Sequence, residues 1–272
     1  MTAVTTRQAK TVNKYRAIFI SDLHLGFRGC QADRLLDFLR STESEFLYLA
    51  GDIFDGWEMK KRPYWPPAHQ EVVKLILHKA ANGTQVIYTP GNHDECARDF
   101  CGHSFDNILV RDTAIHTTAD DRKLLVLHGD QFDTVVKVSP VLAHIGASMY
   151  GKLLFLNRVV NAARKLLGKP YWSLAAHLKN KVKNVVSYIG RFEEAVINST
   201  RSQNLDGVVC GHIHHAEITH FGDTLYCNTG DWVESCTALI EKPNGKLEIL
   251  RWVNEHESHD TGTEPSALPK AA

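Results

Sequence analysis

Residues 19–26 read Phe-Ile-Ser-Asp-Leu-His-Leu-Gly, an apolar run that ends in a polar pair, Asp22 and His24. The run Arg16–Ser21 is rich in β-branched and aromatic residues, which predicts a buried strand that stops just before Asp22. The same plan recurs along the chain, with carboxylate, amide or imidazole side chains where a predicted strand ends. The other motifs are Gly51-Asp52-Ile53-Phe54-Asp55, Gly91-Asn92-His93-Asp94, His128-Gly129-Asp130 and Gly211-His212-Ile213-His214.

Short apolar runs set the remaining predicted strands. They are Glu45–Ala50, Gln85–Pro90, Lys123–His128, Asp206–Gly211, Thr224–Asn228, Cys236–Glu241 and Lys246–Trp252. Between the early runs, residues 35–39 and 72–77 place their apolar side chains on one helical face. Strands that alternate with helices at first, and then follow one another closely, predict an α/β fold, more specifically a mixed α+β sandwich.

The polar motifs favour a metal site. One such motif alone is more often a capped turn, since short polar residues favour turns. Several motifs, each at the end of a strand, gather where α/β folds place their ligands. A core that buried so many carboxylates and imidazoles without a cation would be destabilised. Carboxylate, imidazole and amide oxygen together are typical ligands of borderline-hard metal ions.

The composition narrows the class of protein. The 272 residues are 43% hydrophobic, which excludes a mostly disordered chain. No run approaches the roughly 18 apolar residues of a membrane span, and the start of the chain is polar, so we expect neither a membrane protein nor a secreted precursor. The 31 basic residues balance 31 acidic ones, which argues against a nucleic-acid partner. Sparse cysteines without a C-x-x-C pair indicate free thiols in the cytoplasm.

Residues 134–201 interrupt the strand pattern. Their apolar residues follow a helical period to about residue 167, and a second helical pattern runs from about Ser173 to Thr200. We therefore predict a helical, basic cap insertion between core segments 15–133 and 202–254, with polar tails at 1–14 and 255–272. The insertion holds eleven Lys or Arg residues and two acids, Glu193 and Glu194. An apolar face beside such charges suits acyl chains with phosphates, or an anionic membrane surface. An ordinary subdomain with a solvated basic face is the alternative.

The motif order D-x-H, G-D-x-x-D, G-N-H-[DE], a further histidine and G-H-x-H resembles the calcineurin-like metallophosphoesterase superfamily. The resemblance implies a four-layer fold, with two mixed β-sheets flanked by helices and two divalent metal ions at one end. It implies that one ion is held by Asp22, His24 and His214. It implies that the other is held by Asn92, His128 and His212, and that Asp52 bridges the two.

The resemblance also implies a mechanism. Two cations roughly 3.5–4 Å apart bind a phosphoryl group and acidify a water that attacks phosphorus. His93 resembles the family's non-ligand histidine, which stabilises or protonates the leaving oxygen, and Asp55 resembles its carboxylate partner. A purely structural histidine is the alternative for His93. The other histidines, including His69 and His116, lack ligand-like spacing and are expected on the surface or in the core.

Within the superfamily, the chain is most similar to the UDP-2,3-diacylglucosamine pyrophosphatase group of lipid A biosynthesis. The similarity lies in residues 19–26, in Leu-Ala-Gly-Asp-Ile-Phe-Asp-Gly-Trp at 49–57, and in the helical insertion. It implies manganese as the metal, with zinc or iron possible, and a phosphorylated, acylated substrate. It also implies a cytoplasmic enzyme that associates peripherally with the inner membrane face. Trp57, Lys179 and Lys183 are the candidate substrate-binding residues.

One residue departs from that group. The group has arginine where this chain has His93, reading G-N-R-D instead of Gly91-Asn92-His93-Asp94. Arginine is a fixed fork for phosphate oxygens, whereas histidine can also transfer a proton to a poor leaving group. The substitution favours another phosphoester, such as a phospholipid or a soluble nucleotide. A catalytically silent, metal-bound scaffold is the alternative from a different class, and the oligomeric state cannot be predicted.

Overall fold

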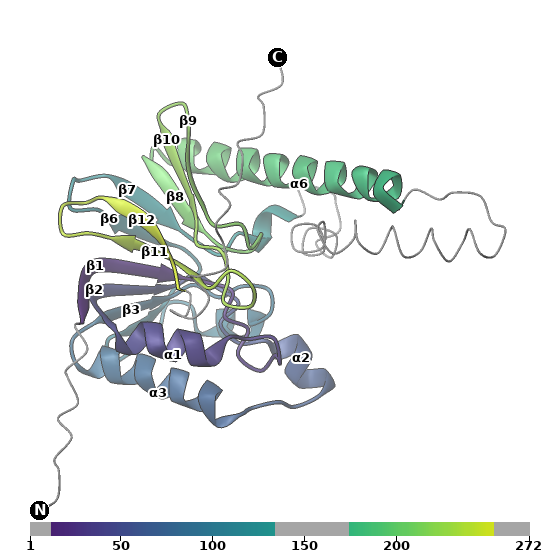
Figure 1. Ribbon diagram of the computed structural model, residues 1–272. Coiled ribbons are helices and arrows are strands. Elements are labelled where there is room, and N and C mark those ends of the chain that lie inside the picture. Colours follow the sequence, from purple (N-terminus) through teal and green to yellow (C-terminus); the bar gives the residue numbers. More distant parts are fainter. Residues whose placement is uncertain (1–11, 134–173, 253–272) are drawn as a thin grey trace, which may run out of the picture.

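The computed structural model describes residues 12–133 and 174–252 (Figure 1). The predicted first helix of the insertion and most of the two predicted tails lie outside these residues. Within α6, Leu174–Ser202, side chains are described from residue 187 onward. None of the helices in the described ranges is both long enough and apolar enough to cross a membrane.

Two mixed β-sheets form the centre of the fold. The first contains seven strands: β1 (Asn13–Ile20), β2 (Thr42–Leu49), β3 (Gln85–Tyr88), β4 (Ser104–Phe105), β5 (Ile108–Val110), β11 (Thr237–Glu241) and β12 (Leu247–Arg251). The second contains five: β6 (Ala114–Thr117), β7 (Lys123–Val126), β8 (Gly207–Cys210), β9 (Glu217–Phe221) and β10 (Thr224–Asn228). Their orders are β12-β11-β1-β2-β3-β5-β4 and β6-β7-β8-β10-β9.

Helices cover the outer faces of both sheets, so the fold has four layers (Figure 1). On the first sheet, α1 (Ala32–Arg40) and α3 (Pro67–Ala81) bury the apolar faces that the periodicity predicts, including Leu35 and Val72. Between the sheets lies a second apolar cluster that includes Phe19 and Val209. On the second sheet lies α6, whose Phe192 is fully buried. The predicted sandwich of two mixed sheets with flanking helices is confirmed.

The structure refines the predicted boundaries. The chain enters β1 at Asn13, slightly before the predicted start of the core at residue 15, because its backbone pairs with Thr42 of β2 whatever its side chain. The end of the predicted insertion also belongs to the core. From Tyr188 to Thr200, α6 buries its apolar face against the second sheet and forms the outer layer of the sandwich.

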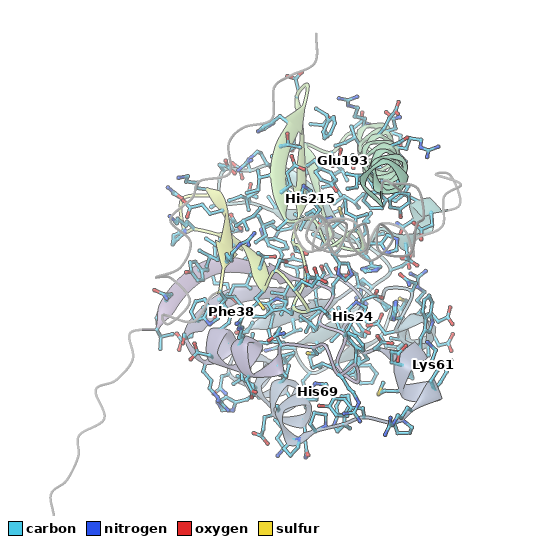
Figure 2. The ribbon with its side chains drawn as sticks, turned by 45° about the vertical axis from the view of Figure 1, so that its right-hand side comes forward. His24, Phe38, Lys61, His69, Glu193 and His215 are labelled. Atoms are coloured by element: carbon cyan, nitrogen blue, oxygen red, sulfur yellow. The ribbon has the colours of Figure 1, made fainter. Side chains whose placement is uncertain are left out.

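The topology brings the polar motifs to one edge. Strands β1, β2 and β3 run parallel to one another, as do β7 and β8. The carboxyl ends of parallel strands meet at the same edge of a sheet, which is where such folds place their ligands. Loops leave this edge into the short helices α2 (Gly56–Lys61), η1 (Glu95–Phe100) and η2 (Asp130–Phe132). In Figure 2, where α6 is seen nearly end-on, His24 lies between His69 and the α6 residue Glu193.

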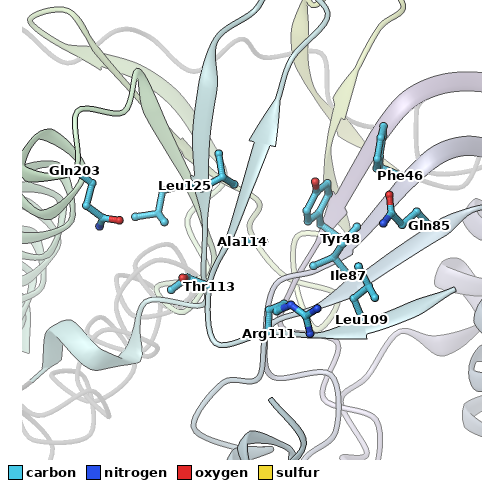
Figure 3. Close-up of a pocket in the computed structure, with 11 residues that line it drawn as sticks. Phe46, Tyr48, Gln85, Ile87, Leu109, Arg111, Thr113, Ala114, Leu125 and Gln203 are labelled. Atoms are coloured by element: carbon cyan, nitrogen blue, oxygen red, sulfur yellow. The ribbon is translucent and has the colours of Figure 1, made fainter. Parts of the chain in front are cut away.

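The side of the sandwich carries a groove of about 490 Å³ (Figure 3). Its walls come from both sheets, with Tyr48 and Ile87 on one and Leu125 on the other, and with Gln203 at the end of α6. None of the residues that line it belongs to the polar motifs. The groove is therefore separate from the edge where those motifs meet.

Candidate metal centre

Three of the predicted ligands form one compact group. Asp22 follows β1 and its Oδ1 lies 3.0 Å from His214 Nε2. His24 Nε2 lies 4.0 Å from the same carboxylate oxygen. All three side chains offer ligand atoms within 4.8 Å of one another. The structure therefore brings together the residues that the resemblance assigns to the first ion.

Asp52 lies between this group and a second one. Its Oδ2 is 3.9 Å from His24 Nε2 and 3.4 Å from His128 Nε2. On the far side, His128 Nε2 is 3.3 Å from Asn92 Oδ1. His128 Nδ1 bonds to the carbonyl of Ala50 at 2.9 Å, which directs Nε2 toward the carboxylate. One carboxylate thus faces ligands of both predicted ions.

His212 is placed differently from the other predicted ligands. Its ring packs against the ring of His128, with centroids 5.0 Å apart, so it borders the second group. Its Nε2 lies 2.9 Å from Asp133 Oδ1, and Asp133 also accepts a 2.6 Å hydrogen bond from the hydroxyl of Tyr188 on α6. Asp133 and Tyr188 are not among the residues predicted from the sequence, because nothing in their local sequence points to the site.

The backbone at this edge takes up an unusual conformation. Asp22, His24, Asp52, His212 and His214 all have φ between 52° and 69°. Such values cost free energy in non-glycine residues and cluster at functional sites, where the surroundings hold them in place. The backbone is thus bent so that alternate side chains point into one cluster.

Close packing explains the glycine of the second motif. Gly51 has a φ of +85°, and a Cβ at this residue would lie 2.3 Å from the ring of His128. Any side chain here would displace that imidazole, and L residues rarely adopt this φ. Glycine is therefore required at this position for the ring of His128 to approach the Asp52 loop.

The cluster keeps its carboxylates ionised. Burial alone would raise the pKa of Asp52, but the adjacent His128, together with His24 and His93, lowers it below the ordinary range. Burial would likewise raise the pKa of Asp22, but the adjacent His214 outweighs this effect and lowers the pKa below the ordinary range. Ionised carboxylates are the form that binds metal ions.

Asp55 connects a predicted ligand to the predicted catalytic histidine. Its Oδ2 bonds to His24 Nδ1 at 3.1 Å, and its Oδ1 lies 3.1 Å from His93 Nδ1. The indole of Trp57 packs on the His93 ring at a centroid distance of 4.1 Å and is 44% exposed. His93 Nε2 is turned toward the cluster, 4.0 Å from Asp52 Oδ2. The predicted contact between Asp55 and His93 is thus present, and Asp55 has a second contact that the sequence did not predict.

A family model for the calcineurin-like phosphoesterases matches residues 15–216. The chain belongs to the calcineurin-like phosphoesterase family. By class it is therefore a metal-dependent phosphoester hydrolase.

Relatives of this calcineurin-like phosphoesterase that carry a specific name share a quarter to a third of its residues over the aligned range. It is 25% identical over 240 residues to a UDP-2,3-diacylglucosamine hydrolase of Neisseria gonorrhoeae, covering 82% of this chain and 92% of the relative. It is 34% identical over 122 residues to a protein of the same name from Xanthomonas oryzae pv. oryzae, covering 42% of this chain and 46% of the relative.

Among solved structures, an archaeal phosphodiesterase aligns at 13% identity with a TM-score of 0.43, covering 86% of this chain and 98% of the other. A Vps29 variant from Entamoeba histolytica aligns at 13% identity with a TM-score of 0.42, covering 87% and 99%. The family assignment rests on the sequence match and not on these distant likenesses.

The donor set fits the divalent metal ions that the family implies. In residues 12–133 and 174–252, His24 Nε2 is buried beside two carboxylates and has no hydrogen-bond partner. A buried polar atom in that state costs free energy unless a ligand satisfies it. Carboxylate oxygens, an amide oxygen and imidazole nitrogens suit manganese, iron and zinc. A cation at this position would complete contacts that the protein alone leaves unmade.

Further residues hold the motif loops in place. Asp94, the last residue of its motif, accepts hydrogen bonds from the backbone N–H groups of Ile53 and Gly91, at 2.7 and 2.6 Å, and from the Tyr88 hydroxyl at 2.6 Å. Arg98 and Asp130 form an ion pair at 2.7 Å that joins two motif loops. These contacts fix the loops that carry Asp52, Asn92 and His128.

Two candidate residues lie outside the described side chains, and two other histidines lie in the core. The side chains of Lys179 and Lys183 are not among those described, so their substrate-binding role stays a prediction. His69 is buried and accepts a 2.9 Å hydrogen bond from the backbone N–H of Gly26. His116 is buried between the sheets, 2.6 Å from Glu241. Both are core side chains, as expected from their spacing.

Proposed function

We propose that the protein is a two-metal hydrolase that cleaves a phosphoric diester or diphosphate. In this proposal Asp22, His24 and His214 hold one ion. Asn92, His128 and His212 hold the other, and Asp52 bridges them. The observation that carries the proposal is the position of Asp52, whose Oδ2 faces His24 on one side and His128 on the other. Two ions so held would bind a phosphoryl group and supply an activated water as the nucleophile.

His93 and Asp55 serve the leaving group in this proposal. Asp55 holds the Nδ1 side of His93, and Trp57 packs on the face of the ring. Nε2 is thereby directed at the cluster, where the leaving oxygen of a bound phosphoester would lie. A histidine so placed donates a proton to a poor leaving group. A catalytically silent scaffold would have no use for such a residue.

For the substrate we propose a phosphorylated, acylated small molecule of the UDP-2,3-diacylglucosamine kind, cleaved with manganese. The named relatives support this choice, since two matches bear that substrate in their names. We further propose that the basic insertion, with Lys179 and Lys183, binds the phosphates or acyl chains at an anionic membrane face. Trp57, exposed beside His93, is a described residue that would contact such a substrate in this proposal.

His93 supports a second candidate, a phospholipid or soluble nucleotide diester. A diphosphate bond has a good leaving group and needs little acid catalysis, whereas an alkyl ester depends on it. UDP-2,3-diacylglucosamine agrees with the names of the relatives but gives His93 no role as an acid. An alkyl diester gives His93 that role.

A hydrolysis panel with manganese decides between these substrates. It compares UDP-diacylglucosamine, a phospholipid, a cyclic nucleotide and an aryl phosphodiester with the wild-type protein and with Asp99→Asn, a matched exposed change near the site. Preference for UDP-diacylglucosamine by about tenfold or more in kcat/KM supports the leading substrate, and preference for an alkyl diester supports the second. No turnover of any substrate by metal-loaded protein would support the scaffold and overturn the hydrolase proposal.

A further inference from the structure

The rings of two predicted metal ligands are held by oxygen acceptors. His24 bonds through Nδ1 to Asp55, and His128 bonds through Nδ1 to the carbonyl of Ala50. In both residues Nε2 is the nitrogen that faces the ligand cluster. Histidines that bind metals almost always donate their other ring N–H to a carboxylate or carbonyl, which fixes the tautomer and the ring orientation. Each of these acceptors therefore selects which nitrogen a metal ion meets.

His212 follows the same rule with its nitrogens exchanged. Its Nε2 lies 2.9 Å from Asp133 Oδ1, and an ionised carboxylate can only accept. The hydrogen bond therefore places the proton on Nε2 and leaves Nδ1 as the ring atom available to an ion. The ring is held on its face as well, since Phe192 of α6 packs on it with centroids 5.9 Å apart.

Asp133 is itself held by α6. The hydroxyl of Tyr188 donates a 2.6 Å hydrogen bond to the same oxygen that faces His212. Tyr188 is 2% exposed, so water competes little with its hydroxyl for the hydrogen bond to Asp133. Helix α6 also contacts η2 and the strands β8 and β10, and in Figure 1 one end of it lies beside the second sheet while the rest extends away from the strands. The helix thus reaches the ligand cluster through one aromatic hydroxyl and one aromatic face.

We infer that Asp133 and Tyr188 are positioning residues that hold His212 in the Nε2–H tautomer for binding of the second metal ion. Asp133 acts on the ring directly, and Tyr188 acts through Asp133. Helix α6 thereby forms part of the metal centre in addition to covering the second sheet. The inference rests on the proposed two-ion centre and names residues that lie outside its motifs.

Metal affinity tests the inference directly. Asp133→Ala removes the acceptor, and affinity for the second manganese ion should fall about ten- to a hundredfold, the usual cost of losing such a partner. Asp133→Asn keeps an acceptor oxygen and should recover most of that loss. Tyr188→Phe should cost about threefold, since the carboxylate remains but is held less firmly. Stepwise manganese titration followed by electron paramagnetic resonance measures both ions, with Glu194→Gln on the exposed face of α6 as the matched control.

The tautomer supplies a readout that is independent of affinity. In metal-free protein, where no ion fixes the tautomer, long-range ¹H–¹⁵N spectra of the imidazoles should show Nε2 of His212 protonated in the wild type and in Asp133→Asn. In Asp133→Ala, neither ring nitrogen of His212 should be preferentially protonated. Circular dichroism checks that each variant is folded. If Asp133→Ala does not fold, Asp133→Asn and Tyr188→Phe still test the inference.

The outcomes separate the inference from the proposed function. If the wild type binds fewer than two ions, the two-ion proposal itself fails. If the wild type binds two ions and Asp133→Ala binds the second with wild-type affinity and tautomer, the positioning role is overturned and the two-ion centre stands. If Asp133→Asn loses as much affinity as Asp133→Ala, the carboxylate acts through its charge or as a ligand, and the tautomer role is again overturned.

Discussion

Replacing His93 by alanine tests the proposed chemistry most sharply, because this residue lies beside the proposed ligands His24 and Asp52 but is not assigned to either ion. His93 Nδ1 lies against Asp55 Oδ1, while the other oxygen of Asp55 bonds to His24. Removal of the His93 side chain leaves the contact between Asp55 and His24 in place. Metal binding should therefore be unchanged in His93→Ala, and any loss of rate belongs to the leaving-group side of the reaction.

The expected magnitude follows from this geometry. The ring faces the cluster with Nε2, 4.0 Å from Asp52 Oδ2, where it can deliver one proton to the leaving oxygen. General acid catalysis by one positioned side chain contributes about 10²- to 10⁴-fold. On an alkyl phosphodiester this corresponds to about 3–5 kcal/mol of activation free energy. A nitrophenyl ester, whose leaving group departs without a proton, should lose much less.

The assay is the ratio of kcat/KM for the alkyl and nitrophenyl esters in the wild type, His93→Ala and His93→Arg. His93→Arg restores the residue of the diacylglucosamine group and should favour a diphosphate substrate over the alkyl ester. His103→Ala, an exposed histidine away from the cluster, controls for the loss of an imidazole. A ratio that stays constant in all variants would refute acid catalysis by His93 and would leave only phosphate positioning.

Three further predictions address the metal, the insertion and stability. Asp52→Ala should abolish turnover and lower the content of bound metal, because both ions lose a ligand; full occupancy with normal activity, measured by elemental analysis, would contradict the two-metal assignment. Neutralising three basic residues of α6, chosen from Lys179, Lys181, Lys183 and Arg191, should weaken binding to anionic vesicles and hydrolysis of an acylated substrate. Hydrolysis of a small aryl phosphodiester should be unchanged. Equal losses on both substrates would indicate a structural segment. Burial alone would raise the pKa of Glu241, but hydrogen bonds from His116, the Ala119 N–H and Arg16 lower it. This network should therefore stabilise the fold above about pH 4.3 and lose that contribution as the pH falls through the lowered pKa. Glu241→Gln should lower the free energy of unfolding at pH 7 by roughly 3 kcal/mol and flatten its acid-side pH dependence, as measured by urea titration; an unchanged slope would contradict this.

The parts of the fold that the sequence predicts are those with a strong local signal. Buried strands such as β8 and the second half of β1 read as continuous apolar runs, and α1 and α3 carry clear helical faces. Four strands were not predicted from the sequence: β4, β5, β6 and β9. These strands are short or half exposed, so their residues alternate too weakly to reveal a period. Their place in the sheets comes from backbone pairing with stronger neighbours.

The candidate site divides in the same way. Residues that follow a strand within a short motif, such as Asp22 and Asp52, could be found because strand ends meet at one edge. Asp133 and Tyr188 are 55 residues apart in sequence and meet only because α6 packs on the second sheet. A side chain that acts through tertiary packing leaves no local pattern. For this reason the contact of Asp55 with His93 was predicted, whereas its contact with His24 was not.

The position of α6 changes how the basic insertion should be understood. The composition alone treats residues 134–201 as one appended segment with an apolar face for a ligand. From Tyr188 onward that apolar face is already occupied by the second sheet, and Phe192 and Tyr188 lie against His212 and Asp133. From Tyr188 onward, that face is therefore not available to acyl chains. Lys179 and Lys183 precede Tyr188 in the chain, so the proposed contact with acyl chains or an anionic membrane depends on residues before the part of α6 that packs on the second sheet.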